Sequence, residues 1–281
     1  MSFFKGSAPG ATCDFLHALY AGEVFLLPPT TASDELAQSV QVMLADALGP
    51  DPGAIYCGQS ADHFRILGAL RKRLFTEADM HAALFRVVES LGHDPKEFLC
   101  DPLRLRVVES GGHDNPRAAP VYTPHRDTWY AHPQSLVTWW IPLADTAASE
   151  TFVFYPDCFA RAVANDSHNF EYRAWVEKGW DLKIGWQDRE AGRTEHYPGA
   201  LGPFETGLPR GFACKRGQIL VFSGAHFHET LRQTSGRTRF SVDFRLVHAG
   251  DLRAGRGAPN VDARARGSAI ADYVRGTAIP T

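Results

Sequence analysis

From Phe98 onward the chain is a succession of short runs rich in β-branched and aromatic residues, each ended by glycine, proline or aspartate. Such runs are typical of strands, and many short strands separated by turns indicate a sandwich or a barrel. Their alternation is imperfect, as expected where strands line a site on one face and pack on the other. The expected strands are 103–109, 135–143, 151–155, 218–223 and 239–246.

The first 97 residues have helical periodicity instead. Ser33 and Asp34 can begin a helix that Gly49 ends, a second helix is expected over 61–74, and Thr76 can begin a third. These segments predict a helical N-terminal layer.

No internal repeat and no sharp break in composition divides the chain, so the helical part and the β-rich part are expected to belong to one domain. We expect a single domain over 1–281, mainly β with flanking helices. Its expected parts are a helical layer at 1–97, a β core at 98–250 with an insertion at about 160–210, and a partly ordered tail at 251–281.

Composition excludes several classes of protein. With 44% hydrophobic residues in 281 the chain can bury a large core, and 29 basic against 32 acidic residues leave no basic footprint for nucleic acid. No apolar run approaches a membrane span, and the N-terminus lacks the pattern of a signal peptide. We therefore expect a cytoplasmic protein that meets neither a membrane nor nucleic acid, with an oligomeric state that the sequence does not indicate.

Cysteine and nucleotide motifs are also uninformative. Five cysteines stand far apart without a Cys-x-x-Cys pair, so reduced thiols are expected rather than disulfides or a zinc ribbon. Rossmann and phosphate-loop motifs are absent from the sequence.

The residues with the clearest chemistry are His125 and Asp127, which flank one residue, and His228 a hundred positions later. Residues two apart on an extended segment face the same side, so the imidazole and the carboxylate can meet at one point. Two histidines and one carboxylate on one face of an octahedron leave three positions open, as an iron(II) oxygenase requires. Twelve histidines make a chance His-x-Asp unsurprising, but this is the only one and no His-x-Glu occurs.

A basic strand follows His228, in which Arg239, Ser241, Asp243 and Arg245 share one face. The paired donors of Arg239, with Ser241 beside it, suit the far carboxylate of a dicarboxylic 2-oxo acid that chelates the metal. The alternative is a solvated edge strand.

These residues together resemble the Fe(II)/2-oxoglutarate-dependent dioxygenases, within them the phytanoyl-CoA dioxygenase-like branch. The resemblance lies in His125-Arg126-Asp127, in the run GQILVFSGAHFH that ends at His228, and in Arg239 eleven residues later. Gln233 stands where an asparagine is common. The matching motifs span about 100–248, and the N-terminal part matches only in general character.

The resemblance implies a double-stranded β-helix, or jelly-roll, core. It implies His125, Asp127 and His228 as iron ligands and Arg239 with Ser241 as the 2-oxoglutarate clamp. The implied activity couples oxidative decarboxylation of 2-oxoglutarate by dioxygen to hydroxylation, or related C–H oxidation, of a small molecule, with specialised metabolism as the expected setting. A carboxylate at position 127 implies oxygenation rather than halogenation.

Several assignments stay open beside this interpretation. His226 competes with His228 as the distal ligand, and the interval to Arg239 favours His228. Tyr122 and Thr138 are positions from which a side chain could touch the co-substrate. Alternatives are a cupin-like metal-binding protein or isomerase that does not use 2-oxoglutarate, and a protein that uses its tryptophan-rich insertion only as an interaction surface.

The neighbouring aromatic and basic residues add two expectations. At most one of Trp139 and Trp140 can face a cavity, because adjacent residues of a strand point to opposite sides. Arg104 and Arg106 share a face and could meet an anion or form a solvated rim.

Overall fold

The computed structural model describes residues 2–55, 61–115, 118–179 and 197–276, and all structural statements below concern these residues. The helices are α1 (Thr12–Tyr20), α2 (Thr31–Leu48), α3 (Pro52–Ile55), α4 (Ala61–Thr76), α5 (Ala78–Ser90), α6 (Ala119–Tyr122), α7 (Tyr172–Gly179) and α8 (Ala249–Ala254). The strands are β1 (Phe4–Lys5), β2 (Val24–Leu27), β3 (Phe98–Val108), β4 (Leu136–Pro142), β5 (Phe152–Phe154), β6 (Ile219–Ser223), β7 (His228–Thr230), β8 (Arg239–His248) and β9 (Val274–Arg275).

Two sheets organise these strands. The major sheet has seven strands in the order β1-β2-β6-β4-β8-β3-β9, and the minor sheet pairs β5 with β7. All pairings are antiparallel except that of β1 with β2. This mixed, mainly β arrangement with helices agrees with the jelly-roll-like fold class expected from the sequence.

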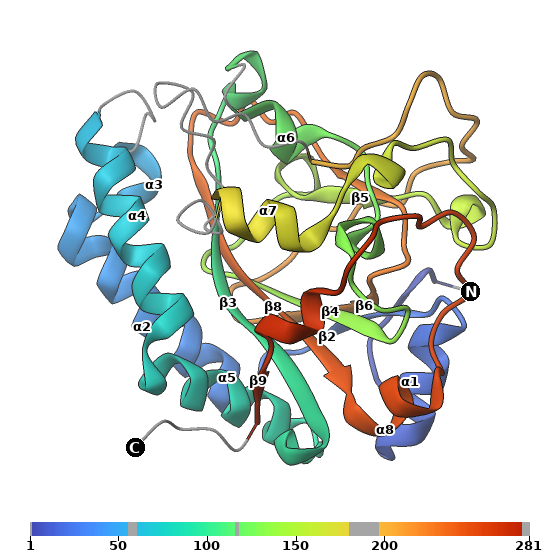
Figure 1. The fold of residues 1–281 in the computed structure, drawn as a ribbon. Helices are drawn as coiled ribbons and strands as arrows, with labels where there is room; N and C mark the ends of the chain where they lie inside the picture. The colour runs from blue at the N-terminus through green and yellow to red at the C-terminus, as the bar shows by residue number, and fades with distance from the viewer. Residues whose placement is uncertain (1, 56–60, 116–117, 180–196, 277–281) are drawn as a thin grey trace.

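The helices α2, α4 and α5 lie along one side of the major sheet, and α7 crosses in front of its central strands (Figure 1). The largest apolar cluster fills the space between these three helices and the sheet. On β8, four apolar side chains belong to this cluster: Phe240, Val242, Phe244 and Leu246.

The intervening residues of β8 face the other way. As predicted from the two-residue period, Arg239, Asp243 and Arg245 line a cavity and alternate along β8 with these four apolar side chains. The same rule separates two neighbouring tryptophans of β4, because Trp139 joins the helix-side cluster while Trp140 lines the cavity. One face of the sheet therefore forms the core and the other forms the site.

The N-terminal segment differs from the helical layer expected over 1–97. Besides helices it contains β1 and β2, which extend the major sheet next to β6. The cap of α2 is Thr30, whose hydroxyl accepts from the Ser33 amide, so the helix begins before the predicted Ser33. Thr76 ends α4 instead of capping α5, whose first residue follows Glu77.

The segment after Gly250, expected to be a partly ordered tail, is held along the body of the protein through residue 276. It forms α8, and β9 pairs with β3. Within the insertion, α7 is observed, while Trp180 and Trp186 lie outside the described residues. No described helix combines the length and the apolar character needed to cross a membrane.

Four cysteines are free thiols, as expected from the sequence: Cys13, Cys100, Cys158 and Cys214. Cys57 lies outside the described residues.

Candidate metal centre

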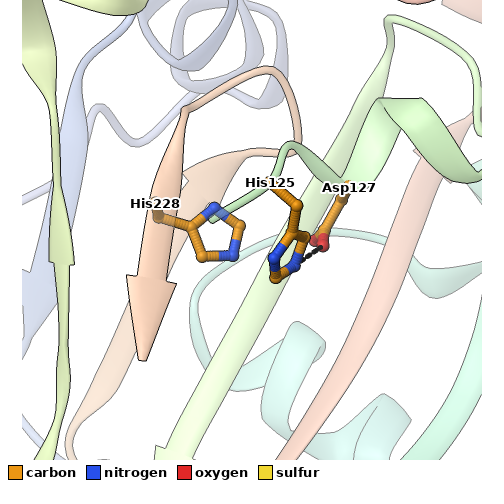
Figure 2. A group of neighbouring side chains, drawn as sticks. All are labelled: His125, Asp127 and His228. Atoms are coloured by element: carbon orange, nitrogen blue, oxygen red, sulfur yellow. Dashed lines mark ion pairs between the residues drawn. The ribbon is translucent and has the colours of Figure 1, made fainter. Parts of the chain in front are cut away.

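The structure brings His125, Asp127 and His228 together, with one potential ligand atom of each lying within 4.8 Å of the others. Figure 2 shows the two imidazoles and the carboxylate directed toward a common point, His228 coming from β7 and the other two from the segment after α6. The backbones of the two histidines pair directly, since each amide donates to the other residue's carbonyl at 3.0 Å. Segments a hundred residues apart are thereby fixed in register at the site.

A glycine lets the two segments approach. The Thr128 amide donates to the Gly224 carbonyl at 3.2 Å. A Cβ at Gly224 would lie 2.5 Å from Leu136 Cδ2 and 3.2 Å from Asp127 Cβ, so any larger residue would force Leu136 or Asp127 to shift.

In both histidines a contact of Nδ1 with a backbone carbonyl orients the ring, so that Nε2 is the nitrogen available to a metal. His125 Nδ1 lies 2.7 Å from the Thr123 carbonyl, and His228 Nδ1 lies 2.9 Å from the His226 carbonyl. A carbonyl can only accept, so each Nδ1 carries the proton and each Nε2 presents its lone pair to the common point. Burial, together with the nearby His125, lowers the pKa of His228 to about 4, which keeps this imidazole neutral.

The Asp127 carboxylate has one oxygen engaged and one available. Its Oδ2 accepts from Thr138 Oγ1 at 2.6 Å and from Arg245 Nε at 3.4 Å, while Oδ1 lies 3.6 Å from His125 Nε2. Burial alone would raise the pKa of Asp127, but the Arg245 guanidinium and the two histidines bring it well below the usual range. The group is therefore a carboxylate, ready to offer Oδ1 to a metal.

The buried Arg245 lies at the centre of an ion-pair network that the sequence did not predict. Its NH1 and NH2 lie 3.1 Å from Asp101 Oδ2 and 3.6 Å from Asp243 Oδ2. Arg104 pairs with Asp101 at 2.7 Å, and Arg106 grips Asp243 with two bonds of 2.6 and 2.9 Å. Both arginines of β3 thus meet carboxylates of the protein.

A shift of register in β3 makes this network possible. The pairing with β8 slips between Asp101 and Arg104, so that two residues three apart both lie on the cavity side. Asp101 stands opposite Arg245 and Arg104 opposite Asp243. A regular strand would have turned Asp101 into the apolar cluster.

Arg239 is different, because it makes no ion pair with any carboxylate in the described ranges. It is 8% exposed, its NH1 donates to Ser241 Oγ at 3.1 Å, and its Nε has no hydrogen-bond partner. The guanidinium carbon lies 5.4 Å from the centre of the Trp140 ring. Burial lowers the pKa of Arg239 to about 10, so it remains a cation at neutral pH, buried and with no ion-pair partner among the residues described.

Three other predicted contact residues have different surroundings. Ser241 does not line the cavity but accepts from Arg239 and from Trp140 Nε1, so it holds both side chains in place. Thr138 lines the cavity and bonds Asp127. Tyr122 lies outside the cavity lining, with its ring against His113.

The residue between the two ligands, Arg126, joins distant segments around the site. It is 1% exposed, and its guanidinium donates to the carbonyls of Ala225, Cys158 and Arg161. Its Nε donates to Asp262 Oδ2 at 3.0 Å. Arg126 therefore links the segment of His125 and Asp127 to the loop before His228 and to the C-terminal segment.

Asp262, in the C-terminal segment, is the counterion of Arg126 and supports the segment that carries His125 and Asp127. Besides Arg126 it accepts from Trp129 Nε1 at 2.7 Å and from the Val163 amide at 2.9 Å. Nothing in the sequence marked it, because its importance depends on contacts with residues 99 to 136 positions away.

Replacing Asp262 by alanine is expected to lower the free energy of unfolding by about 3 to 5 kcal/mol, because Arg126 would stay buried without a counterion. Urea denaturation measures the change. The control Glu177→Ala removes the partner of Arg173 in an exposed ion pair and should cost no more than about 1 kcal/mol. Equal losses in the two variants would contradict the assigned role.

His226, the competing ligand of the sequence analysis, is a buried packing residue. It is 1% exposed, with Phe159 and Phe154 rings at 4.5 and 5.4 Å. Within the described part of the chain neither ring nitrogen reaches a partner in hydrogen-bond geometry, although the Gly22 backbone lies close. Its carbonyl orients His228.

Burial lowers the pKa of His226 to about 3, so the unfolded chain takes up a proton before the native protein does. Stability must therefore fall as the pH drops below about 6.5, by about 1.4 kcal/mol per pH unit for this residue. His226→Phe is expected to remove this residue's contribution to the loss of stability. The free energy of unfolding of the variant, relative to that of the parent, should therefore rise from pH 7 to pH 5. Denaturation of both metal-free proteins across this range tests the prediction, and parallel profiles would refute it.

The cavity containing these groups has a volume of about 250 Å³. This is near the lower end for small-molecule sites, which span about 300 to 1,000 Å³. The triad and Arg239 both line this cavity. One ligand can therefore reach both the Arg239 guanidinium and the point at which the ligand atoms of the triad meet, called the metal point below.

Comparisons with known proteins add only distant likenesses. No family model and no curated protein matches the chain. The apo form of ThoJ, titled a non-heme monooxygenase, is 12% identical with a TM-score of 0.45, covering 83% of this chain and 76% of that one. SnoN, titled an epimerase and solved with Fe3+, alpha ketoglutarate and nogalamycin RO, is 13% identical with a TM-score of 0.42, covering 90% and 94%. SnoK, titled an alpha ketoglutarate dependent carbocyclase, is 10% identical with a TM-score of 0.40, covering 91% and 96%. We assign no activity from likenesses this distant.

Proposed function

We propose that the protein is an Fe(II)- and 2-oxoglutarate-dependent oxygenase of the phytanoyl-CoA dioxygenase-like branch, with a double-stranded β-helix core. The observation that carries the proposal is a metal-ligating triad in one cavity with a buried guanidinium that has no counterion in the described part of the chain. Its substrate would be a small molecule, hydroxylated or oxidised at a related C–H bond.

The donor set suits ferrous iron. His125 and His228 would ligate through Nε2 and Asp127 through Oδ1, because their other polar atoms are already engaged. Two imidazoles and one carboxylate are the ligands of non-haem iron(II) oxygenases, whose remaining positions stay open. Iron held there would supply the activation of dioxygen, driven by oxidative decarboxylation of 2-oxoglutarate to succinate and carbon dioxide.

Charge balance favours a dianionic co-substrate. Arg104, Arg106 and Arg245 are matched by Asp101, Asp127 and Asp243, which leaves Arg239 as the excess cation among these seven groups. A ferrous ion adds two positive charges to the cavity. A dicarboxylate that reaches both the metal and Arg239 removes two charges and hydrogen-bonds the orphaned Nε.

The protein's own groups then have defined tasks. Arg239, held by Ser241, would bind the far carboxylate of 2-oxoglutarate, while Trp140 and the neighbouring aromatic rings exclude water from that end. Thr138 and Arg245 keep Asp127 in one orientation, so the carboxylate would contribute a single oxygen and leave space for the co-substrate.

Turnover tests the proposal. The purified protein, reconstituted with ferrous iron under air, is expected to convert 2-oxoglutarate to succinate slowly by itself and faster with a suitable substrate. Heat-denatured protein is the control for free iron. An iron-loaded, folded preparation that never forms succinate would contradict the proposal and favour a cupin-like protein that does not use 2-oxoglutarate, for which Arg239 would have no evident purpose.

A further inference from the structure

The half of the cavity beyond the triad carries an aromatic wall, formed by Tyr130, Phe170, Tyr172, Trp175 and Tyr197. Tyr130 begins it, with its ring 5.4 Å from that of the metal-ligating His125. The rings then contact one another in sequence: Tyr130 with Phe170 at 6.0 Å, Phe170 with Trp175 at 6.1 Å, and Trp175 with Tyr172 at 5.9 Å. The aromatic wall therefore starts at the metal point and continues onto α7.

These rings are not simply core. Trp139, on the helix side of the sheet, is 1% exposed, whereas four of the five rings in the aromatic wall keep partial exposure and only Phe170 is buried. Partly exposed rings that gather around a cavity favour a ligand with a flat apolar surface.

Most polar atoms on the rings of the aromatic wall already form hydrogen bonds with other groups of the protein. The Tyr130 hydroxyl donates to the Pro198 carbonyl at 3.1 Å, and the Tyr172 hydroxyl donates to the Asp272 carboxylate. Trp175 differs, because its Nε1 is shielded from solvent and no residue that the structure describes accepts a hydrogen bond from it. The aromatic wall thus offers ring faces and one N–H donor, which suits one acceptor oxygen on a ligand.

The charges of the cavity disfavour a cationic ligand. Among the described residues its lining carboxylates are Asp127, directed at the metal point, and Asp243, held bidentately by Arg106. An ammonium group would find no free carboxylate and would lie among guanidinium groups.

We propose that the substrate is an uncharged molecule with a planar aromatic ring system and an oxygen acceptor, stacked on the aromatic wall with the acceptor bonded to Trp175 Nε1. Calling this ligand the substrate rests on the proposed function, whereas its binding requires neither iron nor 2-oxoglutarate.

The test uses three matched probes in equilibrium binding by calorimetry: 2-naphthol, its saturated counterpart 2-decalol, and the cation 2-(aminomethyl)naphthalene. Binding is measured on the full chain, both metal-free and, without oxygen, loaded with Fe(II) and 2-oxoglutarate. 2-Naphthol is expected to bind at least about tenfold more tightly than either of the others, from stacking and the absence of a counterion for the amine.

Two substitutions locate the binding. Trp175→Ala should weaken 2-naphthol binding about tenfold or more, and Trp175→Phe about three- to tenfold, because it keeps a ring but loses the donor. Tyr155→Phe, an aromatic change outside the cavity lining, is the control and should leave binding unchanged. The circular dichroism spectrum verifies that each variant is folded.

The outcomes separate the two proposals. Equal affinity for the three probes, or an unchanged affinity in Trp175→Ala, would overturn the substrate class even in a protein that forms succinate. Selective, Trp175-dependent binding of 2-naphthol to metal-free protein would support an aromatic ligand even if no succinate is ever formed.

Discussion

Replacing Asp127 by alanine is expected to abolish iron binding and succinate formation. Loss of a partner that merely supports a metal ligand lowers affinity by about 10- to 100-fold, so loss of the carboxylate ligand should exceed a hundredfold. The variant should still fold, because Arg245 keeps Asp101 at 3.1 Å and Asp243 at 3.6 Å. Anaerobic titration with ferrous iron measures the affinity, and circular dichroism verifies the fold.

Asp114→Ala is the matched control for this change. Asp114 also lies beside a histidine, with His113 Nε2 at 3.7 Å, but its side chain is 86% exposed and far less enclosed. This substitution should leave iron affinity at the parent value. If Asp127→Ala bound ferrous iron as tightly as the parent, the metal centre assigned to these residues would be wrong.

Replacing Arg239 by methionine is expected to have opposite effects on ligand affinity and on stability. Truncating one partner of a buried charge pair costs about 2 to 5 kcal/mol, so the Kd for 2-oxoglutarate should rise about 30-fold or more at unchanged iron affinity. The ligand-free variant should be as stable as the parent or more stable, because the buried guanidinium has no counterion to lose in the described part of the chain. Calorimetric titration and urea denaturation measure the two effects.

Arg106→Met is the control, since both arginines line the same cavity and only Arg106 grips a carboxylate. Its loss leaves the buried Asp243 with only the more distant Arg245, so it should destabilise the protein, while 2-oxoglutarate affinity changes less. If Arg239→Met instead cost as much stability as Arg106→Met and left the affinity unchanged, the anion site would be wrongly placed.

Much of the site could be predicted because it depends on local periodicity. The two-residue period of a strand places Arg239, Asp243 and Arg245 on one face and separates Trp139 from Trp140, whatever the rest of the fold. The spacing of His125 and Asp127 likewise predicts that both side chains meet at one point, although the segment is extended only as far as Arg126 and Asp127 begins a short 3-10 helix, Asp127–Tyr130.

The rest depends on contacts that no local pattern records. The bulge in β3 changes which residues share a face, so the pairing of Asp101 with Arg245 could not be predicted from spacing alone. The role of Asp262 depends on the C-terminal segment lying against Arg126, a contact across 136 residues of sequence. The strand β2 was missed because four residues in a helical region give no distinct periodicity before their pairing with β6 is known.

One measurement tests the central claim, that three side chains hold a ferrous ion beside a guanidinium that binds 2-oxoglutarate. Anaerobic protein is titrated first with Fe(II) and then with 2-oxoglutarate, and the visible charge-transfer absorption of the iron–2-oxo acid chelate is followed. The account predicts one iron per chain and an absorption band that saturates with one 2-oxoglutarate, is lost in His228→Ala, and requires far more 2-oxoglutarate in Arg239→Met. A parent protein that binds no iron, or an identical titration in all three proteins, would contradict it.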